Sequence, residues 1–228
     1  MKSATLDVIA GLNPEEEQEP EKKIEVERTP ELERILKGFE QVLASANDLL
    51  FSDMVARFTP EQMPTATITQ ASIALAAYSS YIRFPDRAGR YLTALVNFSS
   101  DYEHTIFVNG YTQPPNHIGF WLDKKLVVDG PTGINTGLYN QGELILRGNS
   151  GIYTGFHNEG DIILFGNACD KAGHYNEGRI SIDGSVGENF GFGNIGTIWL
   201  NGSFKSLSSD YLGKGDIYHN GKLLVRGH

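Results

Sequence analysis

The second half of the chain is a repeat with a fixed period, and this repeat limits the possible folds more than any other feature of the sequence. Each copy has a short aliphatic core, as in GELILRG at 142–148 and GDIILFG at 160–166. The copies occupy residues 124–130, 142–148, 160–166, 178–184, 196–202 and, one position late, 215–221, so the period is eighteen positions. A fixed period of this length with one strand per copy is typical of a β-solenoid, in which each copy forms one coil.

Glycine and asparagine stand in fixed columns of the repeat. Of the 26 glycines, 22 lie from residue 119 onward, where sharp corners at positive φ favour a residue without a Cβ. One asparagine precedes each of four strands: Asn140, Asn158, Asn176 and Asn194. In stacked coils these amides can form a hydrogen-bonded ladder. The columns therefore indicate coil corners rather than phosphate-binding loops.

Two types of solenoid accommodate a coil of this length. Left-handed solenoids built from hexapeptides, the architecture of many acyltransferases, place an aliphatic residue at every sixth position, usually followed by a small one. Here Leu144 is followed by the large Ile145, and the column six positions further on contains Ser150, Ala168 and Val186. This poor match favours a right-handed β-solenoid, so we predict a mainly β domain over residues 100–228.

The segments GELILRGNSG at 142–151 and GDIILFGNA at 160–168 resemble the GXGXG repeat. That repeat forms the right-handed β-helix of the glutamate synthase C-terminal domain and of one subunit in formylmethanofuran dehydrogenase. The resemblance covers about residues 122–211 and implies a structural support without active-site residues. The chain departs from the family where Asn-Glu-Gly replaces paired glycines before the strand, and where Cys169 and Lys205 replace turn glycines.

The first half of the chain has helical periodicity. From the capping residue Thr29 onward, apolar residues recur at three- and four-residue steps, which places them on one helix face. Two further helices are predicted over about 68–82 and 87–98. We therefore expect residues 29–99 to form a small helical unit that packs on or caps the solenoid.

Residues 1–28 differ in composition from the rest. Nine glutamates against four basic residues give residues 15–34 a net charge of −5, and few apolar side chains are available to form a core. We expect an acidic flexible tail. It begins with a short apolar peptide, either a frayed terminus or a docking segment for a protein partner, with candidate contacts Leu6, Val8, Ile9 and Leu12.

The outward positions of the predicted strands carry apolar side chains. Because side chains alternate along a strand, Leu144 and Leu146 should point into the coil and the residue between them outward. The outward column and its neighbour give the candidate protein-interaction residues Val127, Ile145, Ile163, Phe165 and Trp199. Strands that are apolar on both faces are normally covered on both. We expect either the helices of residues 29–99 or another protein chain to cover this column.

The last predicted strand, at 222–226, leaves a solenoid end with an open strand edge. Such an edge pairs readily with another chain, so we expect homodimerisation through this end. Deleting residues 222–228 should then lower the molecular mass in solution.

The sequence contains no recognisable catalytic or cofactor motif. Its six histidines form no HExxH or His-x-His pair, its single cysteine is Cys169, and P-loop and G-x-S-x-G motifs are absent. We therefore predict no metal, no cofactor and no catalytic residue. The separation of His157 and His174 is one position short of a full period, which puts them near the same corner of successive coils. There they are either surface residues or a shared site.

Charge and composition narrow the choice of partners and location. The net charge of −9 argues against a general affinity for nucleic acid, although −5 of it falls in residues 15–34 and a ribonucleoprotein partner stays open. No apolar run approaches the roughly 18 residues that a membrane-spanning helix needs. No secretory signal is recognisable, and a single cysteine cannot form an internal disulfide. We expect a cytoplasmic protein without a membrane span.

Three functions fit these features. We favour the first, a non-enzymatic scaffold or regulatory and assembly protein that acts through protein–protein contacts in a larger complex. The second is an accessory structural subunit of an oxidoreductase of the resembled kind. The third is a solenoid acyltransferase with His157 or His174 as the base, which predicts a trimer.

Overall fold

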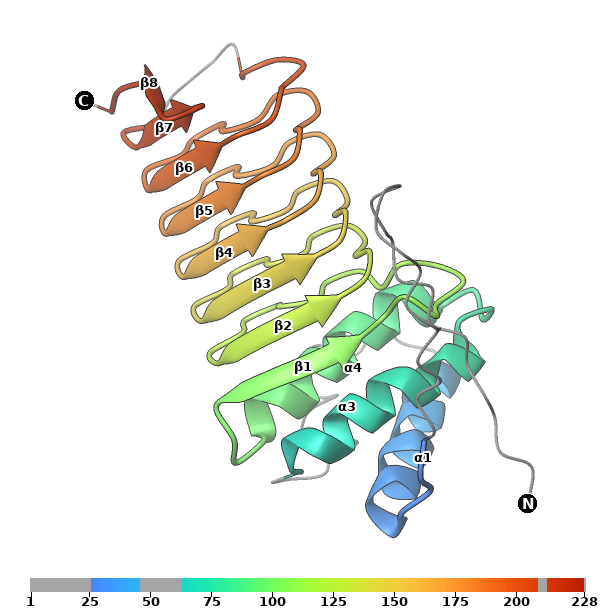
Figure 1. The fold of residues 1–228 in the computed structure, drawn as a ribbon. Coiled ribbons are helices and arrows are strands. Elements are labelled where there is room, and N and C mark those ends of the chain that lie inside the picture. Colours follow the sequence, from blue (N-terminus) through green and yellow to red (C-terminus); the bar gives the residue numbers. More distant parts are fainter. Residues whose placement is uncertain (1–25, 46–62, 209–212, 228) are drawn as a thin grey trace, which may run out of the picture.

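The computed structural model describes residues 26–45, 63–208 and 213–227. Figure 1 shows a row of stacked coils, with helices gathered beyond one end of the row, next to β1. The predicted fold class is confirmed: a helical unit precedes a parallel β-solenoid, and the predicted period relates its strands through most of its length. Among the helices in these ranges, none is long and apolar enough to cross a membrane.

The first helix, α1 (Pro30–Ala44), begins where the sequence predicts. The Thr29 hydroxyl accepts a hydrogen bond from the backbone N–H of Leu32 at 3.2 Å, as an N-cap does. The apolar face of α1 is buried, and the Phe39 ring lies 5.3 Å from the ring of Tyr91 between centroids. α1 therefore forms the core of the helical unit together with the two helices that follow.

The next helices differ from the prediction at their ends. The single helix expected over 68–82 is α3 (Thr65–Ala74) followed by a short 3₁₀ helix, η1 (Leu75–Tyr78). The last helix, α4 (Phe84–Phe98), begins before the predicted residue 87 because Pro85 lies in its first turn, where the missing N–H of proline costs nothing. Pro85 therefore lies in the first turn of α4, and not in the link between two helices.

α3 lies along the outer edge of β1 (Glu103–Phe107) and hydrogen-bonds to its backbone through hydroxyl side chains. The bonds are Thr65 Oγ1 to Glu103 O (3.1 Å), Thr69 Oγ1 to Thr105 O (2.7 Å) and Phe107 N to Ser72 Oγ (3.0 Å). The three hydroxyls lie on one helix face because they follow one another at steps of four and three positions. They form hydrogen bonds with backbone C=O and N–H groups that an open sheet edge would leave unpaired.

Eight strands form one sheet in chain order. After β1 they are β2 (Lys125–Asp129), β3 (Glu143–Arg147), β4 (Asp161–Leu164), β5 (Arg179–Ile182), β6 (Thr197–Leu200), β7 (Asp216–His219) and β8 (Lys222–Val225). β1 to β7 are parallel, and β1 escaped prediction because the step from Glu103 to its partner Lys125 is longer than the repeat period. β8 folds back antiparallel to β7 and ends the sheet.

The interior of each coil is filled as the alternation predicts. Leu144 and Leu146 are fully buried, as are their equivalents in the neighbouring strands. Beside them the asparagine ladder is present, and each Nδ2 donates to the Oδ1 of the next asparagine at 2.8 Å, over Asn140, Asn158, Asn176 and Asn194. The ladder is completely buried, so it holds successive coils in register from within.

Candidate functional site: two faces of the solenoid

The outward column of the sheet is only partly exposed. Val127, the first residue of the column, is buried at 6% exposure and stands in the coil next to β1 and the helical unit. Ile145 and Ile163 are half-buried neighbours in the same column. Trp199 is 37% exposed, and Phe165, which follows Ile163 by two residues just past the end of β4, is 57% exposed.

The column continues beyond the predicted residues to the end of the sheet. The ring of Trp199 stacks on Tyr218 of β7, with centroids 6.0 Å apart and planes inclined by 13°. Leu223 of β8 stands opposite Tyr218. We call this surface the sheet-face stripe, made of Ile145, Ile163, Phe165, Trp199, Tyr218 and Leu223. The helices α1, α3 and α4 lie beyond β1 and do not cover it (Figure 1).

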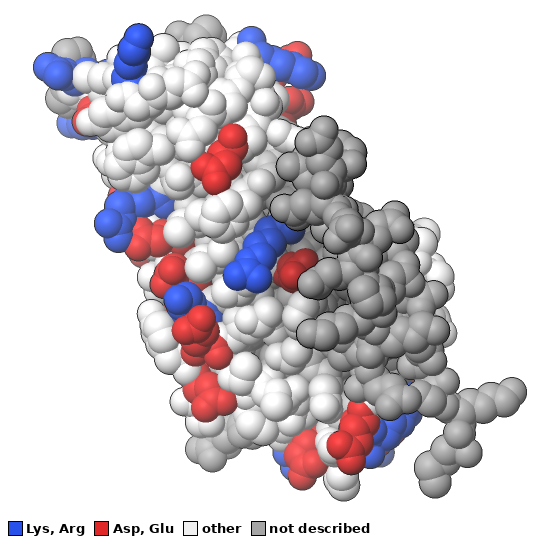
Figure 2. Space-filling model, viewed as in Figure 1, with Lys and Arg blue, Asp and Glu red and all other residues white. Residues whose placement is uncertain are grey.

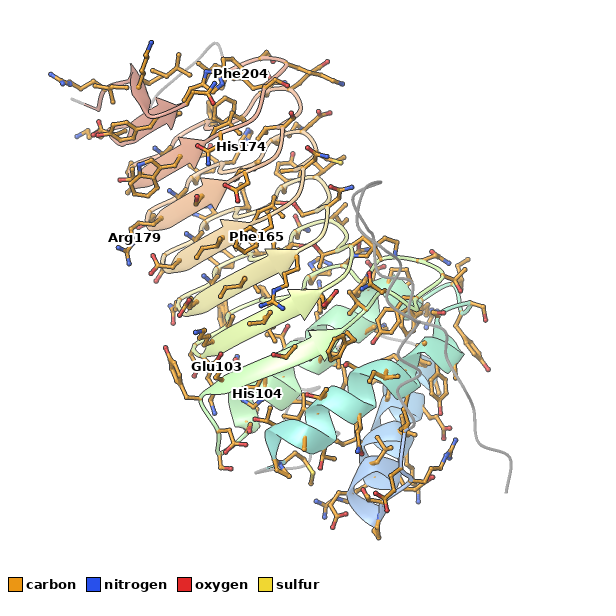
Figure 3. The ribbon with its side chains drawn as sticks, in the orientation of Figure 1. Glu103, His104, Phe165, His174, Arg179 and Phe204 are labelled. Carbon is orange, nitrogen blue, oxygen red and sulfur yellow. The ribbon has the colours of Figure 1, made fainter. Side chains whose placement is uncertain are left out.

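Ion pairs line one rim of the sheet face. Lys125 Nζ lies 3.5 Å from a carboxylate oxygen of Glu103 and 3.9 Å from one of Glu143. Further along the rim, Arg179 binds both carboxylate oxygens of Asp161, at 2.6 and 2.5 Å. Figure 2 shows this alternation of acidic and basic atoms along the left rim, and Figure 3 marks Glu103 and Arg179 there, apart from Phe165. The stripe is therefore an apolar band, interrupted by Ser181 between Ile163 and Trp199, beside a charged border.

The return side of each coil has an unusual backbone. A five-residue arc, such as 153–157, places its first, third and fifth residues at positive φ. The third residue of the arc is glycine in every coil, as predicted for a corner. The fifth residue is a large ring residue with φ between 50° and 52° in four arcs: Trp121, Tyr139, His157 and Tyr175. Left-handed backbone costs a residue with a Cβ about 1–2 kcal/mol. Coil-to-coil contacts must offset this cost.

Ring stacking supplies such contacts. The imidazole of His157 lies between the rings of Tyr139 (5.2 Å, 16°) and Tyr175 (5.0 Å, 8°). A second column beside it holds Phe156 and Phe192, which meet the stacked rings edge-on. Sequence reasoning missed both columns, although the sequence carries the signal: the ring residues recur with the same period as the glycines.

The arcs of four coils, together with Ser208 of the following coil, line an open groove with a volume of about 430 Å³. Its walls are Asn135, Tyr153, Phe156, Lys171, His174, Tyr175, Asn189, Phe192 and Ser208. Lys171 Nζ donates to the Tyr153 hydroxyl at 2.8 Å and lies 4.8 Å from the centre of that ring. The groove thus combines aromatic walls with a cation and several amide and hydroxyl groups.

The two histidines of interest lie in neighbouring coils but do not form a pair. The backbone N–H of His157 donates to the carbonyl of His174, whereas their side chains belong to different columns. His174 Nε2 lies 2.5 Å from the carbonyl oxygen of Asn189, and burial lowers its pKa more than this bond raises it. His157 is enclosed by rings. The two imidazoles therefore contact different rings rather than each other.

The other features considered from the sequence are metal-ligating residues, the cysteine and the N-terminal peptide. Within the ranges that the structure describes, no cluster of three or more His, Cys, Asp or Glu side chains could hold a metal ion. Cys169 is a free, exposed thiol. The peptide residues Leu6, Val8, Ile9 and Leu12 lie outside the described residues.

Comparisons with protein-family models, curated proteins and solved structures found no match.

Proposed function

We propose that this chain is a non-enzymatic scaffold that binds a protein partner through the sheet-face stripe. The observation that carries the proposal is the exposure of large apolar side chains on a parallel sheet, above all Phe165 and Trp199. Both faces of parallel sheets are normally covered, and apolar surface of this kind marks interaction sites. The partner should present an apolar surface to the stripe and charged groups to the ion-pair rim.

Aspartate substitutions on the stripe test this proposal. The tagged full chain is used to capture partners from native lysate, and Ile163→Asp and Phe165→Asp are compared with Ile195→Asp. Ile195 is the matched control because it is 52% exposed but lies outside the sheet strands. A stoichiometric partner should be retained by the control and lost from both stripe variants. Circular dichroism must show that every variant keeps the wild-type fold.

Two results would contradict the proposal. One is a partner that binds the stripe variants as strongly as the wild type. The other is the absence of any stoichiometric partner from native lysate. A larger catalytic oxidoreductase chain as partner would support the narrower role that the GXGXG resemblance implies, an accessory structural subunit.

We also propose that the chain forms a homodimer through β8. This strand ends the sheet, and Leu223 and Leu224 on it are 38% and 40% exposed. An end strand pairs readily with a second copy of itself. Light scattering should give twice the chain mass of 25.1 kDa, and deletion of residues 222–228 should halve it. A monomeric wild-type chain, or a dimer that survives the deletion, would contradict this proposal.

A further inference from the structure

The arc groove differs in charge from the molecule as a whole. The chain has a net charge of −9, but none of the nine groove residues is acidic and one of them, Lys171, is a cation. Within the described part of the chain, Lys171 makes no salt bridge; it contacts the hydroxyl and the ring of Tyr153. A half-buried ammonium group without a carboxylate partner favours an anion at this place.

His174 adds a hydrogen-bond acceptor to the groove. Its Nε2 donates to the carbonyl of Asn189, because a carbonyl oxygen can only accept. Burial lowers the pKa of His174, so the ring is neutral near pH 7 and its Nδ1 carries a lone pair. A ligand that uses both Lys171 and His174 therefore needs an anionic group and a hydroxyl or amine donor.

The remaining walls favour a ring with an apolar face. Phe156, Tyr175 and Phe192 supply aromatic surface, and the side chains of Asn135 and Asn189 supply amides that both donate and accept. Few-atom anions would leave the aromatic walls unused, and purely aromatic acids would leave the amides and His174 Nδ1 unpaired. A sugar has hydroxyl groups around its edge and C–H groups on its face, and so uses both.

We propose that the arc groove binds an acidic sugar, a pyranose that carries one carboxylate or phosphate group. Lys171 binds the anionic group, His174 accepts a hydrogen bond from a sugar hydroxyl, and the aromatic walls hold the ring. The groove volume of about 430 Å³ lies within the range of small-ligand sites. This site lies on the return arcs and is independent of the sheet-face stripe; Figure 3 marks His174 away from the rim at Arg179.

Titration of the full chain with glucuronate, glucose 6-phosphate, glucose and benzoate tests this inference. Binding is followed by isothermal calorimetry and by NMR of the aromatic side chains. Glucuronate or glucose 6-phosphate should bind at least tenfold more tightly than glucose and than benzoate, and the stronger of the two identifies the anionic group. Benzoate that binds as tightly as both acidic sugars would overturn the assignment of a sugar.

Matched lysine variants locate the site. Lys171→Gln removes the groove cation, and Lys205→Gln removes an exposed cation outside the groove. Affinity for the acidic sugar should fall roughly tenfold or more in Lys171→Gln, the usual effect of losing a charged hydrogen bond, and stay unchanged in Lys205→Gln. Equal affinity in wild type and Lys171→Gln, or no binding of either acidic sugar to the wild type, would overturn the proposal. Thermal unfolding confirms that both variants fold.

Discussion

At the scale of single residues, buried asparagine amides account for much of the specificity of this fold. Asn158 is completely buried and connects three coils: it accepts from Asn140, donates to Asn176 and donates to the carbonyl of Gly160 at 2.8 Å. A buried polar group that loses its partner costs more than the bond itself is worth. The ladder therefore stabilises only the register in which every amide meets the next.

Replacing Asn158 with alanine should lower the free energy of unfolding by about 2–3 kcal/mol, since the Asn176 Oδ1 loses its donor and Asn140 its acceptor. Asn201→Ala is the control, because the Asn201 side chain makes one exposed hydrogen bond to Asp183. The control should cost less than about 0.5 kcal/mol. Urea unfolding measures both, and equal losses in the two variants would argue against the ladder.

His117 makes stability depend on pH. Burial, followed by the nearby Arg90 guanidinium, lowers the pKa of His117 from 6.5 to about 4, against the opposing effect of Asp86. In the unfolded chain the imidazole binds a proton near pH 6.5, so the unfolded state gains protons first as pH falls. The stability present above pH 6.5 should therefore be lost between pH 6.5 and about 4, by roughly 1–2 kcal/mol.

His117→Asn provides the comparison, because asparagine tolerates the φ of 61° found there and does not titrate. Its unfolding free energy, measured by urea denaturation from pH 7.5 to 4.5, should decline less than that of the wild type. Parallel pH profiles would mean that His117 is not responsible for the loss.

At the scale of elements, the two ends of the sheet differ. Hydroxyl groups of α3 hydrogen-bond to the backbone at the outer edge of β1, while β8 folds back onto β7.

Thr69→Val and Ser72→Ala should each destabilise the protein by about 1–2 kcal/mol, because each leaves a β1 backbone group without its partner. Thr67→Val is the control on the same helix. Hydrogen exchange at β1 should accelerate in the first two variants alone; if Thr67→Val has the same effect, helix propensity explains the result.

The elements that the sequence predicted best have a clear period: α1, with apolar residues at three- and four-residue steps, and the strands of the repeat. Strands β2 to β6 follow the period of the repeat, and their inward residues and asparagines follow from alternation and stacking. β1 lies off the period because a longer connection precedes β2, and the antiparallel direction of β8 depends on a local turn. The groove could not be predicted because it depends on the backbone conformation of the arcs. In these arcs lysine and tyrosine residues, as well as glycine, adopt positive φ. This conformation brings Lys171 and His174 to the same groove.

At the scale of the whole molecule, the solenoid presents two faces with different chemistry. The sheet face carries an apolar stripe beside an ion-pair rim, and the return arcs carry stacked rings and a groove with one cation. The helical unit lies at the β1 end of the coils (Figure 1). A protein partner on one face and a small acidic ligand on the other can therefore be tested separately.

The two tryptophans provide the most direct test of the central proposal, because they stand on different faces. Trp199 belongs to the sheet-face stripe, whereas Trp121, 54% exposed, belongs to the ring column of the arcs. The chain is labelled with 5-fluorotryptophan, Trp121→Phe assigns the two ¹⁹F signals, and the captured partner is added. If the partner binds the sheet-face stripe, the Trp199 signal should shift while the Trp121 signal keeps its position. A shift of Trp121 alone would contradict it.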